Sequence, residues 1–179
     1  MNGAVAIPDL PPAPRILVRG VNWLGDAVMT TPALLRLREK YPDAHIALLC
    51  PGKLADLWKH HPAVDAVIPF VPDEGVWKVA QKLRFQLGPE VLRNSETKFH
   101  AGDIKAQPLF DTAIVLPNSP RSALEVFFAR IPRRIGYARP WRNFFLTQTV
   151  PSRPGAVKMH KRTAAEVNHL ISQTPDPRP

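Results

Sequence analysis

The sequence predicts an α/β fold in which helices cover both faces of a parallel β-sheet. Short apolar runs with β-branched residues, typical of buried parallel strands, alternate along the chain with segments whose apolar residues recur at helical spacing. Strands that are joined through helices in this way form a parallel sheet with right-handed crossovers. With 179 residues, the chain is long enough for one sizeable domain and too short for two typical ones.

The first strand and the helix after it organise the chain. Residues 16–18 (Ile-Leu-Val) predict a buried strand, and from Asp26 onward the apolar residues recur at helical spacing. Gly25 and Asp26 therefore lie where the strand gives way to the helix, at the edge of a parallel sheet where ligands bind. Glycine permits a positive φ or the close approach of a ligand, as expected here for Gly20 and Gly25. The residues expected to face the sheet are Val28, Leu34, Leu35 and Leu37.

Asp26 has two interpretations on spacing alone. It is either a helix N-cap, which the helix dipole favours, or a carboxylate that projects into a ligand-binding crevice. Pro32 predicts that the helix kinks there, or that it begins only at Thr30 or Thr31. The loop lacks the G-x-G-x-x-G spacing of a dinucleotide-binding site, so we expect neither NAD nor FAD.

The same reasoning places the remaining elements. Further strands are predicted at 45–50, 64–70, 110–116 and 144–150. Helices are predicted at 53–60, after Asn118, and at 157–171. The segment 72–107 permits a helix over 76–83 but has no clear period beyond it, which predicts an insertion or mobile loop.

Composition narrows the function. The net charge of +9 favours anionic partners, but no zinc-finger spacing, aromatic RNA-binding signature or basic helix is present, so we expect no nucleic-acid partner. The single Cys50 excludes a disulfide framework, and His60-His61 has no third ligand at metal spacing; we expect no metal and no cofactor. No apolar stretch approaches the length of a membrane span, and residues 1–14 predict a flexible Pro-rich leader, so we expect a cytoplasmic location.

Two stretches resemble a known family. Residues 15–50, RILVRGVNWLGDAVMTTPALLRLREKYPDAHIALLC, resemble the opening of the ADP-heptose:lipopolysaccharide heptosyltransferases, especially the heptosyltransferase II type of glycosyltransferase family 9. The segment from Asn118 to Tyr137 carries a similar N-S-x-x-S-A-L helix start, followed by I-P-x-R-x-G-Y. The match to the first stretch is long, and it is far more specific than a lone glycine motif.

The resemblance implies a Rossmann-like domain that forms the N-terminal, acceptor-binding half of a two-domain GT-B enzyme. Residues 15–173 would form this domain, 174–179 would be a tail, and the C-terminal nucleotide-sugar domain would be absent. Such an enzyme transfers heptose from ADP-heptose to the lipopolysaccharide inner core with inversion and without a metal. We expect this half to be inactive alone, because the groups that hold the donor diphosphate belong to the other half.

The resemblance also implies roles for particular residues. Asp26 matches the family's general base, which makes a base the favoured interpretation, although a cap and a base are compatible. Asn118 and Ser119 follow a strand at the same sheet edge, so one is expected to cap the helix and the other to bind a sugar hydroxyl. Arg121 is unfavourably placed for the helix dipole, which favours a functional reason for a cation there. The predicted acceptor-binding residues are Asn22, Trp23, Gly25, Asn118, Ser119 and Arg121.

A basic run follows, and its function stays open. Guanidinium groups bind phosphate and carboxylate bidentately, so Arg133, Arg134 and Arg139 are candidates for binding an anionic lipid A and Kdo core. The alternative is a solvated basic face. For the whole chain, the alternative to an enzyme half is a non-catalytic module for anionic glycolipid or a membrane surface, or a truncated remnant. Either function is compatible with peripheral contact at the inner face of the inner membrane.

Overall fold

The computed structural model describes residues 13–85 and 109–151. The predicted helix 157–171, the predicted tail 174–179 and most of the predicted leader lie outside the described residues. So do residues 86–107 of the predicted insertion. The domain prediction of 15–173 is therefore described only in part.

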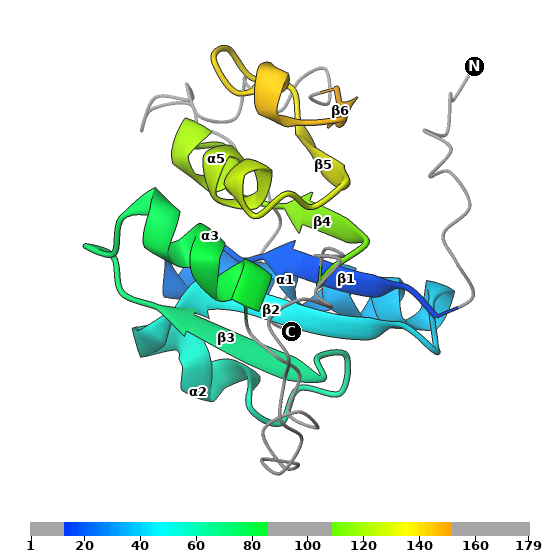
Figure 1. The fold of residues 1–179 in the computed structure, drawn as a ribbon. Helices are drawn as coiled ribbons and strands as arrows, with labels where there is room; N and C mark the ends of the chain where they lie inside the picture. Colours follow the sequence, from blue (N-terminus) through cyan, green and yellow to red (C-terminus); the bar gives the residue numbers. More distant parts are fainter. Residues whose placement is uncertain (1–12, 86–108, 152–179) are drawn as a thin grey trace, which may run out of the picture.

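Within the described residues, six parallel strands form one sheet in the order β3-β2-β1-β4-β5-β6 (Figure 1). The strands are β1 (Arg15–Arg19), β2 (His45–Pro51), β3 (Ala66–Phe70), β4 (Thr112–Val115), β5 (Arg133–Tyr137) and β6 (Gln148–Val150). This order is that of the doubly wound, Rossmann-like folds, in which ligands bind where the chain changes direction across the sheet. The predicted fold class is confirmed.

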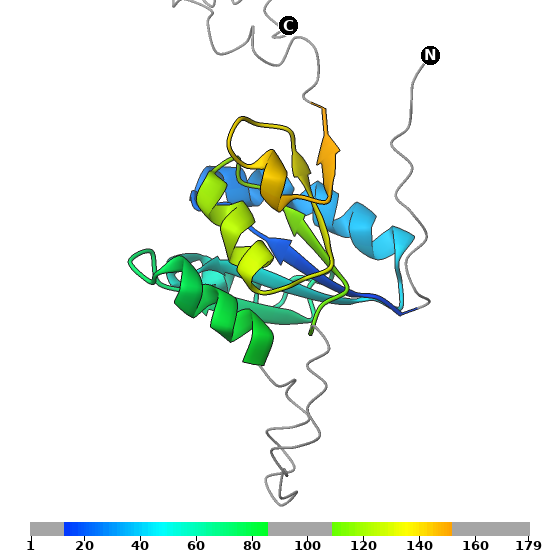
Figure 2. The same cartoon turned by 45° about the horizontal axis from the view of Figure 1, so that its top comes forward.

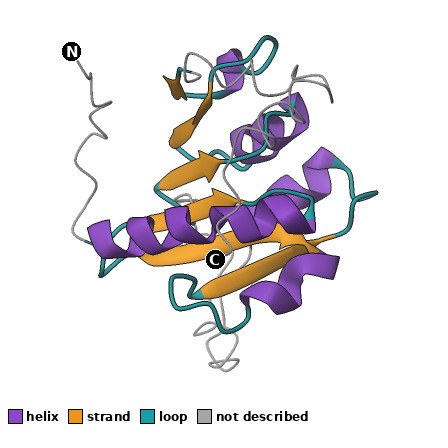
Figure 3. Ribbon diagram, turned by 180° about the vertical axis from the view of Figure 1, so that it is seen from behind, coloured by secondary structure: helices purple, strands orange, loops and turns teal. Residues whose placement is uncertain are grey.

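Helices cover both faces of this sheet. They are α1 (Leu24–Lys40), α2 (Ala55–Trp58), α3 (Val76–Phe85) and α5 (Pro120–Phe128), with 3-10 turns η1 (Gly52–Leu54) and η2 (Asn143–Phe145). Helices α3 and α5 pack on one face, while α1 and α2 pack on the other. Figure 2 shows α3 and α5 side by side over the sheet, and Figure 3 shows α1 lying across the opposite face.

Strand β1 lies in the middle of the sheet and has apolar side chains on both of its faces, so both faces must be covered by helices. Ile16 and Val18 are fully buried toward α1, whereas Leu17 is fully buried toward α3 and α5. Successive side chains along a strand point to opposite faces of the sheet. Burial of each of these apolar side chains stabilises the folded state by about 1.5–3 kcal/mol relative to leaving it exposed. The apolar run predicted the strand correctly.

Helix α1 differs from the prediction at its start and at its buried face. It begins at Leu24 with Trp23 as N-cap and continues through Pro32, so a start at Thr30 or Thr31 is wrong. Pro32 is exposed, and so is Val28, whose carbonyl loses its helical donor to the proline. Water can bind this carbonyl, which explains how the helix tolerates the residue.

The expected apolar face of α1 is also only partly right. Leu34 is buried and Leu37 is half-buried, but Val28 and Leu35 are 52% and 38% exposed. Ala27, which the apolar pattern did not single out, is buried in their place. The small side chain of Ala27 allows α1 to lie close to the sheet. The larger side chains of Val28 and Leu35 then lie at the edge of the contact between α1 and the sheet.

Other boundaries were predicted less well than the elements themselves. The predicted helix 53–60 is divided into η1 and α2, and the first part of the predicted strand 144–150 is the 3-10 turn η2. The helix permitted at 76–83 is present as α3, which buries Val79, Ala80 and Leu83 against the sheet. Within the described ranges, none of the helices has the length and apolar character needed to cross a bilayer.

Candidate functional site

A cleft of about 250 Å³ lies at the carboxyl edge of the sheet. The adjacent strands β1 and β4 lead to helices on opposite faces, so this edge is the topological switch point where α/β proteins bind ligands. The lining residues come from the carboxyl ends of strands β1, β2 and β3 and from the segments that follow β1, β2, β3 and β4. They are Arg19, Asn22, Trp23, Pro51, Lys53, Phe70, Pro72, Ser119 and Arg121.

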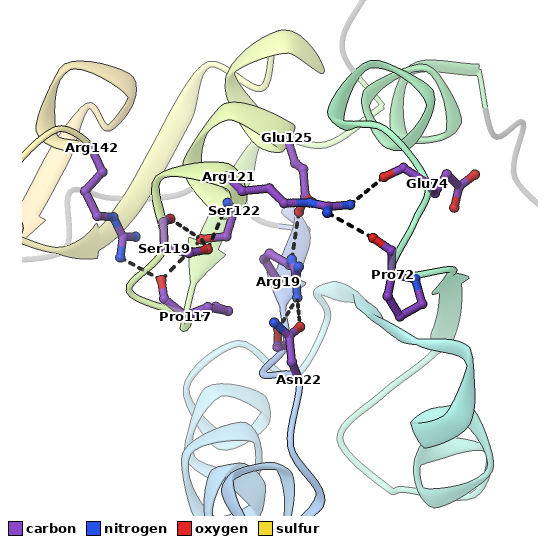
Figure 4. A network of polar contacts seen from close by, with 11 residues as sticks. Arg19, Asn22, Pro72, Glu74, Pro117, Ser119, Arg121, Ser122, Glu125 and Arg142 are labelled. Atoms are coloured by element: carbon purple, nitrogen blue, oxygen red, sulfur yellow. Dashed lines mark hydrogen bonds and ion pairs between the residues drawn. The ribbon is translucent and has the colours of Figure 1, made fainter.

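A buried ion pair forms the floor of the cleft (Figure 4). The Nε of Arg19, at the end of β1, donates to Oε2 of Glu125 in α5 at 2.8 Å, with 2% and 0% of the two side chains exposed. The Nη1 of Arg19 also donates to the carbonyl of Gly20 at 2.6 Å and to Oδ1 of Asn22 at 3.0 Å. The guanidinium carbon lies 4.4 Å from the centre of the Phe70 ring. Arg19 therefore ties the β1–α1 loop to α5 and β3.

A second arginine shares the same carboxylate. The Nε of Arg121 donates to Oε1 of Glu125 at 3.1 Å, and its Nη1 donates to the Pro72 carbonyl at 2.9 Å. Its Nη2 donates to the Glu74 carbonyl (Figure 4). Arg121 was predicted to bind acceptor because a cation is unfavourable in the first turn of a helix. The structure shows another reason for this cation: it joins α5 to the β3–α3 loop while it lines the cleft.

The loop after β1 presents an exposed indole to the cleft. Trp23 is 71% exposed, and the Nζ of Lys53, from η1, lies 5.5 Å from the centre of its ring. Asn22 is also exposed, although its Oδ1 accepts the hydrogen bond from Arg19. The predicted residues Asn22 and Trp23 are thus both brought to the cleft.

Asp26 and Gly25 lie in the first turn of α1, just beyond the lining. Because Trp23 is the N-cap, the interpretation of Asp26 as the cap is wrong. The Asp26 carboxylate is exposed, and among the described residues it has no hydrogen-bond or ion-pair partner. A Cβ on Gly25 would meet nothing within 4 Å and no positive φ is present, so the protein itself does not require glycine there. A role for Gly25 in the close approach of a ligand stays a prediction.

Gly20, in contrast, is required by packing. A Cβ there would lie 3.2 Å from the Leu49 carbonyl oxygen and 3.3 Å from Cδ1 of Leu48. The Gly20 amide also donates to the Leu49 carbonyl at 2.9 Å, which extends the pairing of β1 with β2. Of the two roles predicted for Gly20, the positive φ is wrong, because the conformation is not left-handed, and the close approach that the structure shows is that of the β2 backbone. The absence of a side chain at Gly20 allows the β1–α1 loop to begin in close contact with the backbone of β2.

The loop after β4 carries two polar residues, and one of them caps α5. Ser119 is the N-cap of α5, and its Oγ accepts a hydrogen bond from the Ser122 amide at 3.3 Å. Asn118 is exposed at the same edge. The cap is therefore Ser119, which also lines the cleft, whereas Asn118 is not among the lining residues. Binding of a sugar hydroxyl by Asn118 stays a prediction.

The same loop is held from behind by a fully buried arginine. The Nη1 of Arg142 donates to the Pro117 carbonyl at 2.6 Å, and the Oγ of Ser122 donates to the same carbonyl at 3.3 Å (Figure 4). A Cβ on Gly136 would come within 2.7 Å of Nη2 of Arg142, so this glycine makes room for the guanidinium. Burial and the neighbouring Arg139 lower the pKa of Arg142.

The predicted basic cluster is not one continuous solvated face. Arg142, which continues the predicted basic run three residues after Arg139, is 0% exposed, so the alternative of a solvated basic face is wrong for this residue. The Nε of Arg134 donates to the Phe145 carbonyl at 2.7 Å and its Nη1 donates to the Ile131 carbonyl at 2.5 Å. Burial also lowers the pKa of Arg134. Arg133 and Arg139 are half-buried and make interactions of their own. Anion binding by Arg133, Arg134 and Arg139 stays a prediction.

The structure adds residues that sequence reasoning missed. Arg19, Lys53, Phe70 and Glu125 build the cleft, yet none was predicted as part of a site. A signal was present for two of them, because Arg19 ends an apolar strand and Glu125 interrupts an apolar helix face. A charge in such a position is buried only if it has a partner. The partner lies 106 residues away, which the sequence pattern does not reveal.

The described residues contain no group of three or more metal-ligating side chains. His61, one of the two adjacent histidines, packs edge to face on Trp58, with the ring centres 5.3 Å apart. Its Nδ1 accepts a hydrogen bond from the Ala63 amide at 3.2 Å, and burial lowers the pKa of the imidazole. His61 thus has a packing role in this structure.

Comparisons with known proteins agree with this architecture. No family model matches the sequence. The lipopolysaccharide heptosyltransferase 2 of Salmonella typhimurium is 32% identical over 123 residues, which cover 69% of this chain and 31% of that protein. The lipooligosaccharide heptosyltransferase 2 of Haemophilus ducreyi is 33% identical over 123 residues, which cover 69% of this chain and 30% of that protein. The chain spans about a third of the length of the curated relatives it matches.

Solved structures that resemble this domain also include a heptosyltransferase. The structure of the ADP-heptose lipopolysaccharide heptosyltransferase II of E. coli superposes with a TM-score of 0.57 and 31% identity, and the match covers 78% of this chain and 35% of that one. A glycosyltransferase family 9 protein of Veillonella parvula superposes with a TM-score of 0.60 and 22% identity, over 94% of this chain and 44% of that one. The second match concerns the fold alone.

The parallel sheet, its strand order and the cleft at the switch point define a Rossmann-like domain of the kind found in GT-B glycosyltransferases. Within that class, the sequence matches are all to heptosyltransferases. Over about two thirds of its length, the chain is similar in sequence to heptosyltransferases that act on lipopolysaccharide and lipooligosaccharide.

Proposed function

We propose that this domain is the acceptor-binding half of an inverting glycosyltransferase that transfers heptose from ADP-heptose to the lipopolysaccharide inner core. The observation that carries the proposal is the position of Asp26. Its exposed carboxylate lies in the first turn of α1, three residues after Trp23, which lines the cleft at the switch point of the sheet. The similarity to heptosyltransferases that act on lipopolysaccharide and lipooligosaccharide supports the choice of substrate.

In the proposed reaction Asp26 is the general base. Its carboxylate accepts the proton of an acceptor hydroxyl, and the hydroxyl oxygen forms a bond to the anomeric carbon of the heptose. The bond from that carbon to the diphosphate breaks on the opposite side, and ADP leaves with the electron pair. General-base assistance of this kind typically accounts for 10²–10⁴-fold in rate. We expect the step to proceed without a metal.

The cleft would orient the acceptor for this step. The exposed indole of Trp23 offers a flat apolar surface for the C–H face of a sugar ring, and Asn22 and Asn118 offer amides for its hydroxyl groups. The floor formed by Arg19 and Glu125 is buried and paired, so it holds the loops rather than exchanging partners with a ligand. Orientation near the base is the contribution that such a rigid site makes to catalysis.

The donor would bind a part of the enzyme other than this domain. The chain spans about a third of the curated relatives, and charges that stabilise a leaving diphosphate are needed in the transition state. We therefore expect these 179 residues alone to bind acceptor and to show no heptose transfer. Peripheral association with the inner face of the inner membrane, where a lipid-linked acceptor would be met, is part of the same proposal.

The experiment is a transfer assay with the full native polypeptide, ADP-heptose and a heptose-deficient inner-core acceptor, read by mass spectrometry as the gain of one heptose. Asp26→Asn should lower the rate at least 100-fold, because the amide cannot accept the proton. Asp43→Asn, an exposed carboxylate beyond the far end of α1, is the matched control and should transfer at the normal rate. Because no metal is expected in the reaction, addition of EDTA should leave the transfer rates of the native polypeptide and of Asp43→Asn unchanged.

Two results would contradict the proposal. Normal transfer by Asp26→Asn would exclude Asp26 as the base. Absence of transfer by the native polypeptide, together with inner-core binding that survives Asp26→Asn, would favour the non-catalytic glycolipid-binding module instead.

A further inference from the structure

We propose that the face of the domain formed by α3 and α5 docks on a lipid bilayer whose headgroups are anionic. The contact surface is a groove of about 460 Å³, which shares no lining residue with the cleft at the carboxyl edge of the sheet. We call it the α3–α5 groove, and its lining residues are Trp77, Arg84, Phe127, Phe128, Arg130 and Arg134. The inference rests on the proposed function, because it names the surface and the lipid charge for the peripheral contact included there.

The α3–α5 groove has a row of aromatic rings that the protein covers only in part. The ring centres of Trp77 and Phe128 are 5.9 Å apart, and those of Phe128 and Phe127 are 5.6 Å apart. The row therefore runs from α3 to α5, which lie side by side (Figure 2). The three side chains are 55%, 38% and 39% exposed. Neighbouring exposed rings of this kind mark an interaction surface, and indole rings are enriched where a bilayer meets water.

Basic side chains border these rings. The guanidinium carbon of Arg134 lies 5.4 Å from the centre of the Phe127 ring, and its donors are directed at backbone carbonyls, so this arginine is held in place. Arg130 is exposed, and among the described residues its guanidinium group has no hydrogen-bond or ion-pair partner. Arg130 is therefore available to the phosphate of a headgroup.

The backbone at Arg130 is unusual for its residue type. Its φ is 58°, in the left-handed region, and it directly follows Ala129, the C-cap of α5. Helices commonly end with glycine at this position, because glycine adopts the left-handed conformation without steric cost. An arginine there costs conformational energy that a glycine would avoid, which favours a use for its exposed guanidinium group.

The acidic residues around the groove do not neutralise it. Among the described residues, none of them lines the groove, and α3 itself carries basic residues and no acidic one. Glu74 is paired with Lys82 at 2.8 Å, and Glu125 is fully buried against two arginines. Asp111 accepts a hydrogen bond from a backbone amide of β1 at 2.7 Å. Asp73 is exposed in the turn before α3 and offsets one charge, so the arginines of the groove leave this surface positive.

These properties match an anionic bilayer better than other partners. Aromatic rings lie at the depth of the headgroups, where guanidinium groups bind the phosphates and the negative surface potential attracts basic residues. A second copy of the chain would bring the same positive groove against the first, so like charges disfavour it. An acidic protein segment supplies charge but no apolar layer for the three rings, and the experiment tests it separately.

Co-sedimentation of the 179-residue chain with lipid vesicles tests the proposal. One set of vesicles is phosphatidylcholine alone, and the other contains about one third phosphatidylglycerol. The chain should partition about tenfold more strongly onto the anionic vesicles, because several basic residues contact them. Raising NaCl to about 0.5 M should remove most of this difference, since salt screens the attraction.

Arg130→Gly separates lipid contact from folding. It should weaken partition onto the anionic vesicles about fivefold and also raise the urea midpoint, because glycine relieves the left-handed backbone. A purely structural role for Arg130 would not move the two quantities in these opposite directions. The matched control is Arg36→Gln in α1, on the opposite face, which removes the same charge from a side chain that is 81% exposed. It should leave partition unchanged.

Trp77→Ala tests the aromatic part of the groove. It should weaken partition about fivefold, because the indole no longer enters the headgroup layer. Leu57→Ala is the matched control, since Leu57 is an apolar side chain of α2 on the opposite face and is 41% exposed. This control should partition like the wild type. Urea denaturation verifies that both variants fold.

Four results would overturn the inference. They are equal partition onto neutral and anionic vesicles, unchanged partition of Arg130→Gly and Trp77→Ala, and an equal loss in the two control variants. The fourth is binding of soluble polyglutamate without binding of vesicles, which would assign the groove to an acidic protein.

A soluble acceptor keeps this test apart from the proposed function, because heptose transfer to a soluble inner-core oligosaccharide needs no bilayer. Transfer by the full native polypeptide without vesicle binding would remove the docking surface and leave the proposed function standing. Vesicle binding without transfer would keep the docking surface and contradict the proposed function.

Discussion

At the scale of single residues, the stability of the domain depends on one carboxylate. Glu125 is fully buried and is the anionic partner of both Arg19 and Arg121. Glu125→Ala leaves a buried guanidinium without its carboxylate, and we expect a loss of about 3–5 kcal/mol in the free energy of unfolding. Urea denaturation measures it. Glu39→Ala, which removes an exposed partner of Arg36, should change the same quantity by less than about 1 kcal/mol.

An equal effect of these two substitutions would contradict the interpretation of Glu125. A double variant separates charge from packing: Arg19→Met with Glu125→Leu removes both buried charges while it keeps the volume filled. Replacing a buried ion pair with apolar side chains is often neutral, so the double variant should be more stable than Glu125→Ala.

At the scale of elements, Gly136 in β5 and Gly25 in α1 can be compared, because an added Cβ would be crowded at the first and would meet open space at the second. Gly136 in β5 faces Nη2 of Arg142, which an added Cβ would approach to 2.7 Å, and the Val115 carbonyl at 3.2 Å. Gly136→Ala should therefore destabilise the domain by about 1–3 kcal/mol, because the buried guanidinium must move. Thermal unfolding measures the change, and a neutral result would show that Arg142 can shift without cost.

Gly25 lies in the first turn of α1, where an added Cβ meets nothing within 4 Å. Gly25→Ala should raise the free energy of unfolding by about 0.5–1 kcal/mol, because alanine loses less conformational freedom in a helix. If Gly25 serves the approach of acceptor to Asp26, the same variant should bind the inner-core oligosaccharide more weakly. A more stable variant with unchanged affinity would remove Gly25 from the acceptor site.

The elements also show what the sequence could predict and why the rest required the structure. Alternating apolar runs and helical periods specify strands, helices and a parallel sheet, because these patterns are local. The order of the strands and the pairing of Arg19 with Glu125 depend on contacts between distant residues, which no local period contains. The sequence left two alternatives at Pro32, a helix that continues with a kink or one that begins at Thr30 or Thr31. It could not choose the continuous helix, because the tertiary packing of Ala27 and Leu34 that outweighs the local preference of proline is not a local pattern.

At the scale of the whole molecule, Cys50 reports on the integrity of the sheet. Burial raises the pKa of its thiol to about 11, above the value of about 8.5 in an unfolded chain, and nearby Arg19 offsets part of this rise. The folded state therefore holds the proton more tightly. Its contribution to stability is fully present below about pH 8.5 and is lost as the pH rises through about 11.

Denaturation between pH 8 and pH 11 measures this contribution. The free energy of unfolding of the wild type should fall by about 2–3 kcal/mol more than that of Cys50→Ala over this range. Parallel pH profiles for the two proteins would contradict the assignment. Thiol reagents offer an independent check, since a buried Cys50 should react only when the sheet opens.

The sharing of Glu125 by two arginines also bears on how such a site can diverge among descendants of one gene. Substitutions at Arg19 or Arg121 that would reshape the cleft also disturb a buried pair, so selection for folding removes them before selection for specificity can act. Lys53, Trp23 and Asn118 are exposed and free of that constraint. Inherited variation in acceptor preference should therefore accumulate at these three positions, above a floor that stays the same.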